Sequence, residues 1–234
     1  MIAIELAKTP TAPGAALLFL TAVASGCGHG VMRPGPQARV VSGEPQAAYS
    51  VVEGVRCSAD VGAWRSKVDE LPGGVVPVKV WIKNESGHAI RLLAEDFVMV
   101  GKSGHSYRPV PVVALAGEGA GPRDIEPMYA SSKFYVAPRL HDVYSSLEPW
   151  RAPLQRDEQL YDRQFKRWGK RRPTLQMIRM ALPEGVLDDG GMISGFLYFE
   201  SPLDAESKVN FEADFGRDDG SGTVAAIEIP FRIE

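Results

Sequence analysis

The feature that most restricts the fold is a run with strict alternation, Val75–Asn84. Its apolar residues occupy every second position: Val76, Val78, Val80 and Ile82. Lys79 and Lys83 stand in the opposite register. Successive side chains of a strand point to opposite faces, so the pattern predicts a strand with one buried and one wetter face. Trp81 falls on the wetter face, where we expect another segment to cover it.

Further short runs with strand character are separated by turn residues in both halves of the chain. They predict strands at Tyr49–Val55, His88–Leu93, Phe97–Val100, Ser106–Val113, Phe196–Phe199, Lys208–Phe215 and Thr223–Ile233. The turns Asn84–Gly87 and Gly101–Gly104 are expected to be hairpin connections. Many short strands with closely spaced turn signals favour a mainly all-β sandwich over a sheet with alternating helices.

The stretch between the two groups of strands, about 114–182, has a different composition and predicts a helical insertion. A helical stripe in it begins after Pro153 and ends at Gly169. The apolar members of the stripe are Leu154, Tyr161, Phe165 and Trp168. Residues 174–182 fit either a short helix or a strand, and we favour the helix.

An apolar segment near the start, Ala15–Ala24, runs directly into Ser25-Gly26-Cys27. As a helix it would cover only about half of a ~30 Å hydrocarbon core, which indicates an export signal rather than a spanning helix. The small residues before Cys27 resemble the lipobox of bacterial lipoproteins. An ordinary secretory signal that is cut nearby and a buried core segment are the alternatives.

The lipobox resemblance implies a signal peptide over 1–26 and diacylation (palmitate-type lipid) of Cys27, which becomes the mature amino terminus. Because Gly28 follows Cys27 and not Asp, it further implies sorting to the outer membrane, facing the periplasm. The Gly- and Pro-rich residues 27–48 predict a lipid-anchored flexible linker with a reach of roughly 25 Å. The domain proper is then expected over 49–234.

Cysteine usage is sparse, because Cys27 and Cys57 are the two cysteines of the chain. An exported chain of this size therefore does not rely on a disulfide framework. No His or Lys stands beside Cys57 to favour the thiolate, so we expect it to be a buried, inert thiol. A Cys27–Cys57 bridge stays open only if Cys27 is not acylated.

Strand and turn residues in both halves resemble the telokin-like, immunoglobulin-like domains found in many bacterial lipoproteins of unknown function. The motifs of the first half are Val78-x-Val80-x-Ile82-x-Asn84-x-Ser86, Asp96-Phe97-x-Met99-Val100 and Gly104-x-x-Tyr107-x-Pro109. Those of the second half are Leu187-x-x-Gly190, Gly195-Phe196-Leu197-Tyr198-Phe199, Pro202 and Val209-x-Phe211. The resemblance covers about 48–113 and 183–234. It implies an immunoglobulin-like antiparallel β-sandwich that mediates contacts in the cell envelope, with no catalytic residues to carry over.

No metal or other cofactor is expected. His88 and Met99 have a spacing used by periplasmic copper carriers, but Ala89 and Gly121 stand where that family needs further ligands. The acidic residues Asp214, Asp218 and Asp219 miss the spacing of an EF-hand loop and indicate a solvated turn. Asn84-Glu85-Ser86 is a glycosylation sequon only in a suitable secretory pathway.

No catalytic residues are expected either. The Gly101-Lys102-Ser103 tripeptide lacks the earlier glycine of a nucleotide-binding loop, where Asp96 stands, so it predicts a hairpin tip. Asp214-Phe215-Gly216 lacks the other motifs of a kinase. A site built from His141-Asp142 and a serine stays open. A hydrolase or a metal carrier is therefore the less favoured alternative.

The most distinctive polar feature is a cluster of cations and aromatics over 163–172. Its candidate binding residues are Phe165, Lys166, Arg167, Trp168, Lys170, Arg171 and Arg172. Such a cluster suits anionic lipid headgroups or an acidic protein partner. Nucleic acid is not expected as a partner, because export and a net charge of −3 both argue against it. A solvated helix end whose aromatics pack on the sandwich is an alternative of equal weight.

The sequence thus predicts a non-catalytic lipoprotein of the bacterial cell envelope. We expect it to contact the membrane through its N-terminal lipid and to act as a protein- or envelope-binding or assembly module. A purely structural envelope lipoprotein is the main alternative.

Overall fold

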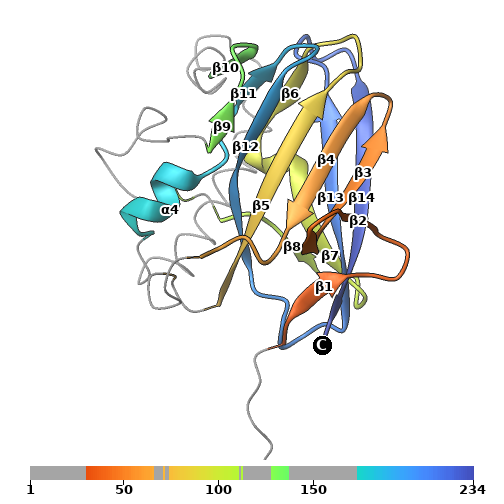
Figure 1. Cartoon of the computed structure of the whole chain (residues 1–234), viewed down its shortest axis with the longest axis vertical. Coiled ribbons are helices and arrows are strands. Elements are labelled where there is room, and N and C mark those ends of the chain that lie inside the picture. The colour runs from red at the N-terminus through yellow and green to blue at the C-terminus, as the bar shows by residue number, and fades with distance from the viewer. Residues whose placement is uncertain (1–29, 66–70, 72–73, 111, 113–127, 137–172) are drawn as a thin grey trace, which may run out of the picture.

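The computed structural model describes residues 30–65, 71, 74–110, 112, 128–136 and 173–234, and these are mainly strands (Figure 1). The strands of the first half are β1 (Met32–Pro34), β2 (Arg39–Val41), β3 (Glu44–Val52), β4 (Val55–Asp60), β5 (Val75–Asn84), β6 (Ile90–Leu92), β7 (Phe97–Gly101) and β8 (Ser106–Tyr107). Those that follow are β9 (Tyr129–Ala130), β10 (Phe134–Val136), β11 (Gly185–Leu187), β12 (Met192–Glu200), β13 (Lys208–Gly216) and β14 (Thr223–Ile233). The described helical elements are a 3₁₀ turn, η2 (Ala94–Asp96), and α4 (Leu175–Met180).

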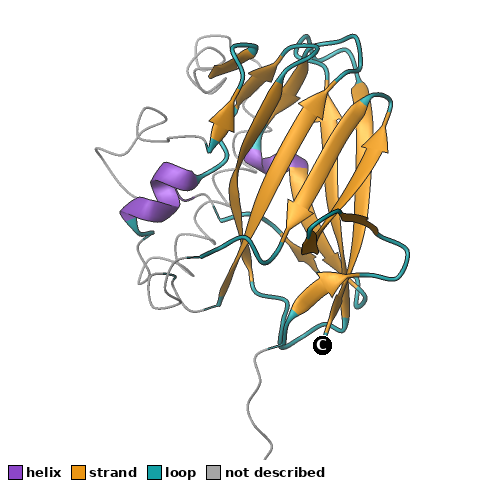
Figure 2. Ribbon diagram, viewed as in Figure 1, coloured by secondary structure: helices purple, strands orange, loops and turns teal. Residues whose placement is uncertain are grey.

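The strands form three sheets in which neighbouring strands are antiparallel. One large sheet has the order β2-β3-β4-β5-β12-β9, and the other has the order β1-β14-β13-β7-β8. We call them the β5 sheet and the β13 sheet. Figure 2 shows them as two facing layers, with the small third sheet, β10-β11-β6, at one end. The predicted all-β class is therefore confirmed.

The main core lies between the two large sheets. In β5 the predicted apolar positions are all buried, from Val76 at 7% exposed to Ile82 at 0%. Aromatic contacts join the layers, because the ring of Phe199 in β12 lies 6.1 Å from that of Phe211 in β13, measured between centroids. Cys57 is fully buried in this core as a free thiol, as predicted. Burial raises the pKa of that thiol far above its ordinary value, which keeps it unreactive.

Strand β12 differs from β5 because both of its faces are buried. Its outward-facing Phe196 and Tyr198 belong to a second apolar cluster with Val110, Val112, Met177 and Ala181. The Trp64 ring packs edge-on against Phe196 at 5.1 Å and against Tyr198 at 5.9 Å. Helix α4 and the segments around Trp64 and Val110 therefore cover this part of the β5 sheet.

The far edge of β12 is covered by short pieces from three parts of the chain. β9 pairs with Ile193 and Ser194, Leu182 N–H donates to Phe196 O at 2.9 Å, and Val110 N–H donates to Tyr198 O at 2.6 Å. The second contact needs a glycine, because a Cβ at Gly195 would lie 2.5 Å from Leu182 Cα. Covering an edge in this way removes unpaired backbone groups that invite aggregation.

The flexible linker predicted over 27–48 is wrong for its described residues. β1 pairs with β14, β2 pairs with β3, and Ala47 and Ala48 are buried. The Gly- and Pro-rich composition instead serves a chain that passes from the edge of one large sheet to the edge of the other. Pro34 lies in the edge strand β1, where a missing N–H is tolerated.

Several strand bounds also differ from those predicted. The run Tyr49–Val55 contains a turn at Glu53–Gly54, so it divides between β3 and β4. Asn84–Gly87 is not a hairpin, because β5 and β6 belong to different sheets, whereas Gly101–Gly104 does join the paired strands β7 and β8. In the run Ser106–Val113 the ladder ends at Tyr107. β5 and β14 have the predicted bounds.

The insertion predicted over about 114–182 is described in part. β9, β10 and α4 fall within it, and α4 confirms the short helix preferred for 174–182. Thr174 caps this helix by accepting a hydrogen bond from Met177 N–H at 3.2 Å. The helix predicted from Leu154 to Trp168 and the signal peptide over 1–26 lie outside the described residues.

Candidate functional site

The residues predicted to carry function all lie outside the described part of the chain. These are Cys27 and the binding candidates Phe165, Lys166, Arg167, Trp168, Lys170, Arg171 and Arg172. The described residues closest to them in sequence are Gly30, Val136 and Pro173. Val136 and, beyond Pro173, Leu175 are exposed apolar residues, at 50% and 74%.

The chain enters the domain at a fixed point beside its C-terminal residues. Val31 N–H donates to Glu234 O at 2.8 Å, and Glu234 N–H donates back to Val31 O at 3.0 Å. Gly30 packs so closely that a Cβ there would lie 2.7 Å from Ile233 Cγ2. We call the end of the domain formed by Gly30, Val31 and Glu234 the base.

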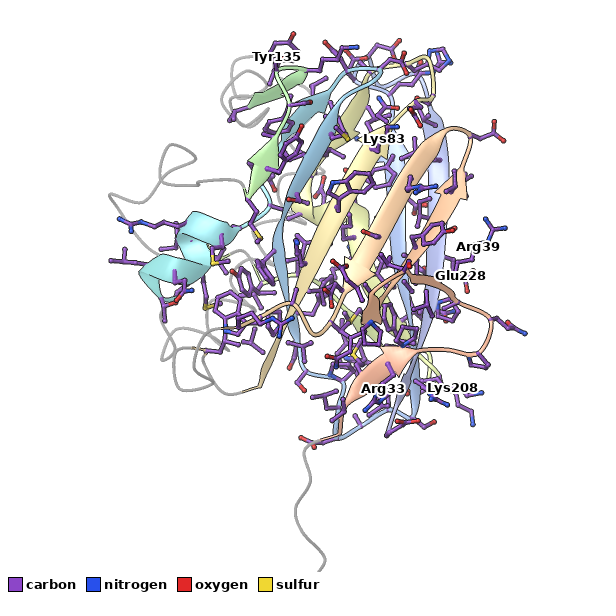
Figure 3. The ribbon with its side chains drawn as sticks, in the orientation of Figure 1. Arg33, Arg39, Lys83, Tyr135, Lys208 and Glu228 are labelled. Atoms are coloured by element: carbon purple, nitrogen blue, oxygen red, sulfur yellow. The ribbon has the colours of Figure 1, made fainter. Side chains whose placement is uncertain are left out.

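A row of cations crosses the β13 sheet at the base. Arg33 in β1 lies directly opposite Arg232 in β14, and Arg232 lies opposite Lys208 in β13. Lys102 continues the row, because its N–H donates to Lys208 O at 3.0 Å. We call Arg33, Arg232, Lys208 and Lys102 the basic row; all four are exposed. Figure 3 shows Arg33 and Lys208 at the lower end of the molecule.

One carboxylate, Glu234, forms ion pairs with the basic row, and Asp204 and Glu206 line a shallow pocket together with Lys102. Glu234 accepts from Arg33 Nε at 3.0 Å and from a terminal nitrogen of Arg232, also at 3.0 Å. Neither Lys208 nor Lys102 forms an ion pair with any described residue. Like charges directly opposite on neighbouring strands are destabilising, so this arrangement is not explained by stability alone.

Carboxylates occupy the same face of the same sheet farther from the base. Glu212 lies directly opposite Glu228 across β13 and β14, and Asp214 follows two residues later on that face. Burial, and then the charges of Glu228 and Asp214, raise the pKa of Glu212. The outer face of the β13 sheet therefore changes from basic at the base to acidic farther along its strands.

The hairpin tip Gly101–Gly104 holds a small polar cluster around Glu206. Ser103 Oγ and Ser103 N–H both donate to the Glu206 carboxylate, the latter at 3.2 Å. These hydrogen bonds lower the pKa of Glu206, with a smaller contribution from Tyr107. The carboxylate binds Ser103 directly, and the His105 ring instead packs on the Tyr107 ring at 4.6 Å. The cluster ties the hairpin to the loop before β13 and does not form a serine–histidine pair.

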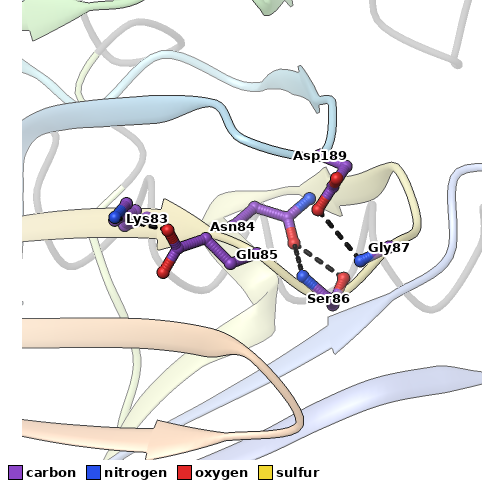
Figure 4. A network of polar contacts seen from close by, with 6 residues as sticks. All are labelled: Lys83, Asn84, Glu85, Ser86, Gly87 and Asp189. Carbon is purple, nitrogen blue, oxygen red and sulfur yellow. Dashed lines mark hydrogen bonds and ion pairs between the residues drawn. The ribbon is translucent and has the colours of Figure 1, made fainter.

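Asn84 holds together the opposite end of the domain (Figure 4). Its side-chain nitrogen donates to His88 O at 2.7 Å and Leu187 O at 2.9 Å, while its oxygen accepts from the N–H and hydroxyl of Ser86. Asn84 is 0% exposed, so every hydrogen bond its amide can make lies within the protein. A glycan on this nitrogen would break those bonds, and the sequon is therefore structural.

A partly buried acidic group, Asp96, lies at the start of β7. Burial raises the pKa of Asp96 to about 7, although the hydrogen bond from Leu93 N–H, at 2.8 Å, and the charge of Arg91 both lower it. Glu184 lies close by and accepts from Ala94 N–H at 3.1 Å. The Asp96 carboxyl closes the η2 turn.

The metal hypotheses find no support among the described residues. Met99 is buried in the main core, whereas His88 lies on an exposed turn, where its ring nitrogen contacts a terminal nitrogen of Arg217 at 2.9 Å. Asp219 binds Ser221 N–H at 2.8 Å within its turn. No group of three metal-ligating side chains is present in the described ranges. His141-Asp142 lies outside them.

Sequence reasoning missed the basic row. Lys208 and Arg232 each alternate with apolar residues in the sequence, but their alignment depends on the register of β1, β14 and β13.

In the described part of the chain, no helix is long and apolar enough to cross a membrane. Comparisons with protein families, with curated proteins and with solved structures gave no match to this chain.

Proposed function

We propose that this chain is a lipid-anchored, immunoglobulin-like β-sandwich of the bacterial cell envelope that acts as a non-catalytic binding or assembly module. In this proposal residues 1–26 are removed and Cys27 carries the lipid. The domain faces the periplasm from the outer membrane. The binding surface is the cationic and aromatic cluster that begins at Phe165.

The strand order supports the immunoglobulin-like part of the proposal. The order β4-β5-β12-β9 corresponds to strands A-B-E-D of such domains, and β14-β13-β7-β8 corresponds to G-F-C-C′. Strands β2 and β3 extend the first of these sheets, and β1 adds an antiparallel strand to the second. The predicted insertion then lies between the strands that correspond to C′ and E.

The observation that carries the binding role is the placement of two surfaces at opposite ends of the molecule. The chain leaves toward Cys27 at the base, beside Arg33, while Tyr135 lies at the far end (Figure 3). Tyr135 and Val136 are 56% and 50% exposed on β10, an edge strand that leads into residues 137–172. A domain attached at one end and exposing apolar side chains at the other is suited to present a binding surface away from a membrane.

The lipid anchor is tested by the mass of the mature protein. We expect membranes of a bacterium that expresses the full chain to contain a protein that begins at Cys27, with the added mass of the acyl chains. The variant Cys27→Ser should remain unprocessed or appear without that mass. An unmodified wild-type terminus would remove the anchor.

The binding role is tested by crosslinking in intact cells of the producing bacterium. The variant carrying Arg167→Ser, Lys170→Ser, Arg171→Ser and Arg172→Ser should lose a crosslinked partner that the wild type retains. A matched control removes four exposed cations elsewhere: Arg39→Ser, Arg56→Ser, Arg108→Ser and Arg179→Ser. Identical crosslinks in all three proteins would favour the purely structural lipoprotein instead.

A further inference from the structure

The connection between Cys27 and the domain is short, because the expected linker is folded into the sheets. Val31 is hydrogen-bonded to Glu234, and Gly30 is packed against Ile233. Only three peptide units separate Cys27 from Gly30, and an extended chain spans at most about 10 Å over that length. An acylated Cys27 would therefore hold the base within about 10 Å of the lipid surface, rather than the ~25 Å that a flexible linker allows.

The cations of the basic row match a negatively charged surface. The four cations lie side by side on neighbouring strands. Of the described residues, only Glu234 forms an ion pair with any of them. Val31, 43% exposed, adds an apolar side chain next to the entry point. The mutual repulsion within the basic row falls when anionic headgroups supply the opposite charge.

The rest of the same face carries charge of the opposite sign. Glu212, Glu228 and Asp214 lie along β13 and β14 beyond the basic row. Figure 3 shows Glu228 farther from the lower end than Lys208. An anionic surface attracts one end of the β13 sheet and repels the remainder, so the charges orient the domain as well as attract it.

We propose that the basic row contacts anionic phospholipid headgroups of the membrane that holds Cys27, so that the domain stands with its base on that surface. This inference rests on the proposed lipid anchor. β13 and β14 then extend away from the bilayer, and the turn after β13 lies roughly 25–30 Å above the base, at about 3.3 Å a residue. Tyr135 is held away from the membrane.

The test measures how far two positions lie from the bilayer in the acylated, full mature protein. A fluorophore is placed at Ser207→Cys at the base or at Ser221→Cys in the far turn, and Cys57 does not react because it is buried. The protein is reconstituted in phosphatidylcholine vesicles with or without phosphatidylglycerol, and energy transfer to an acceptor lipid is recorded. We expect transfer from position 207 to exceed that from 221 at least about threefold with phosphatidylglycerol present.

Removing the cations tests their role directly. The variant Lys102→Ser, Lys208→Ser and Arg232→Ser should let the domain tilt and raise transfer from position 221. The population that stands on its base should fall roughly 100-fold relative to tilted states. The control Arg39→Ser, Arg56→Ser and Arg179→Ser removes the same charge elsewhere and should behave as the wild type. High salt should reproduce the effect of the triple variant.

The outcomes separate this inference from the proposed function. Acylated protein with equal transfer from both positions, or a triple variant that behaves as the wild type, overturns the inference alone. A mature protein that lacks acyl chains overturns the lipid anchor, and this inference with it.

Discussion

The main core and the second cluster lie on opposite faces of strand β12, and different kinds of element cover the two faces. The inner face of β12 meets the β13 sheet, and its Phe199 touches Phe211. The outer face is covered by α4 and by segments near Trp64 and Val110. Long paired strands cover the inner face. Short segments cover the outer face, and they are held in place by their contacts with β12.

Polar groups show the same difference. In the second cluster, Trp64 Nε1 and Tyr198 OH are buried without a hydrogen-bond partner among the described residues. Outside this cluster, the described ranges contain one such atom, Arg91 Nε in β6. An unsatisfied buried hydroxyl costs about 1–3 kcal/mol, so the second cluster is the less optimised of the two. We infer that it is the first to open when the domain is destabilised.

The largest effect is expected in the main core. Phe211→Ala should lower the free energy of unfolding by about 3–5 kcal/mol, because the ring contacts both layers and leaves a cavity that paired strands cannot fill. Denaturant titration followed by circular dichroism measures the loss. A loss below about 1 kcal/mol would show that the two layers are not closely packed at this point.

A smaller and local effect is expected in the second cluster. Met177→Ala should cost about 2 kcal/mol, at the low end for a buried methionine, because α4 is short and can shift to fill the space. Hydrogen exchange should speed up in α4 and remain slow in β5 and β13. Faster exchange in all three elements would mean that the two clusters unfold as one unit.

Stability should also depend on pH through Asp96, at the edge of the main core. Asp96 precedes Phe97 of that core and has a pKa raised to about 7, above its unfolded value near 3.9. The folded protein therefore binds an extra proton between about pH 4 and 7, and its stability falls as the pH rises through this window. Because Asp96 is partly exposed, the loss should be only about 1–2 kcal/mol.

Asp96→Asn provides the control for this pH dependence. The amide oxygen can still accept from Leu93 N–H, so the turn is kept while the titration is lost. Between pH 4 and 8 the free energy of unfolding of the variant should fall less than that of the wild type; the remaining slope belongs to other groups such as Glu212, whose pKa is also raised. An equal slope in both proteins would assign the effect to another group.

The smallest effect should have the opposite sign. Tyr198→Phe removes a buried hydroxyl that has no partner and keeps the ring packed against Trp64. We expect a gain of about 0.5–1 kcal/mol, seen as a small rise in Tm. A loss of stability would show that the hydroxyl is satisfied in solution and that the second cluster is as well optimised as the first.

Local sequence patterns predicted the strands correctly where apolar residues alternate and so mark the buried face of the strand. β5 and β14 have the bounds that their alternation predicts, and α4 follows its cap at Thr174. Composition misled where turn residues are frequent. The segment 30–48 resembles a linker because Gly and Pro mark turns equally well in a chain that joins two sheet edges.

The sequence by itself determined that this chain folds mainly into antiparallel strands around an apolar core that includes Cys57. Alternation and turn residues act over a few neighbouring positions, so they can be read without knowing any partner strand. Only the tertiary structure decided that β12 is buried on both faces, that Val31 is hydrogen-bonded to Glu234, and that four cations form one row. Those features depend on register between strands far apart in sequence, which local patterns do not encode.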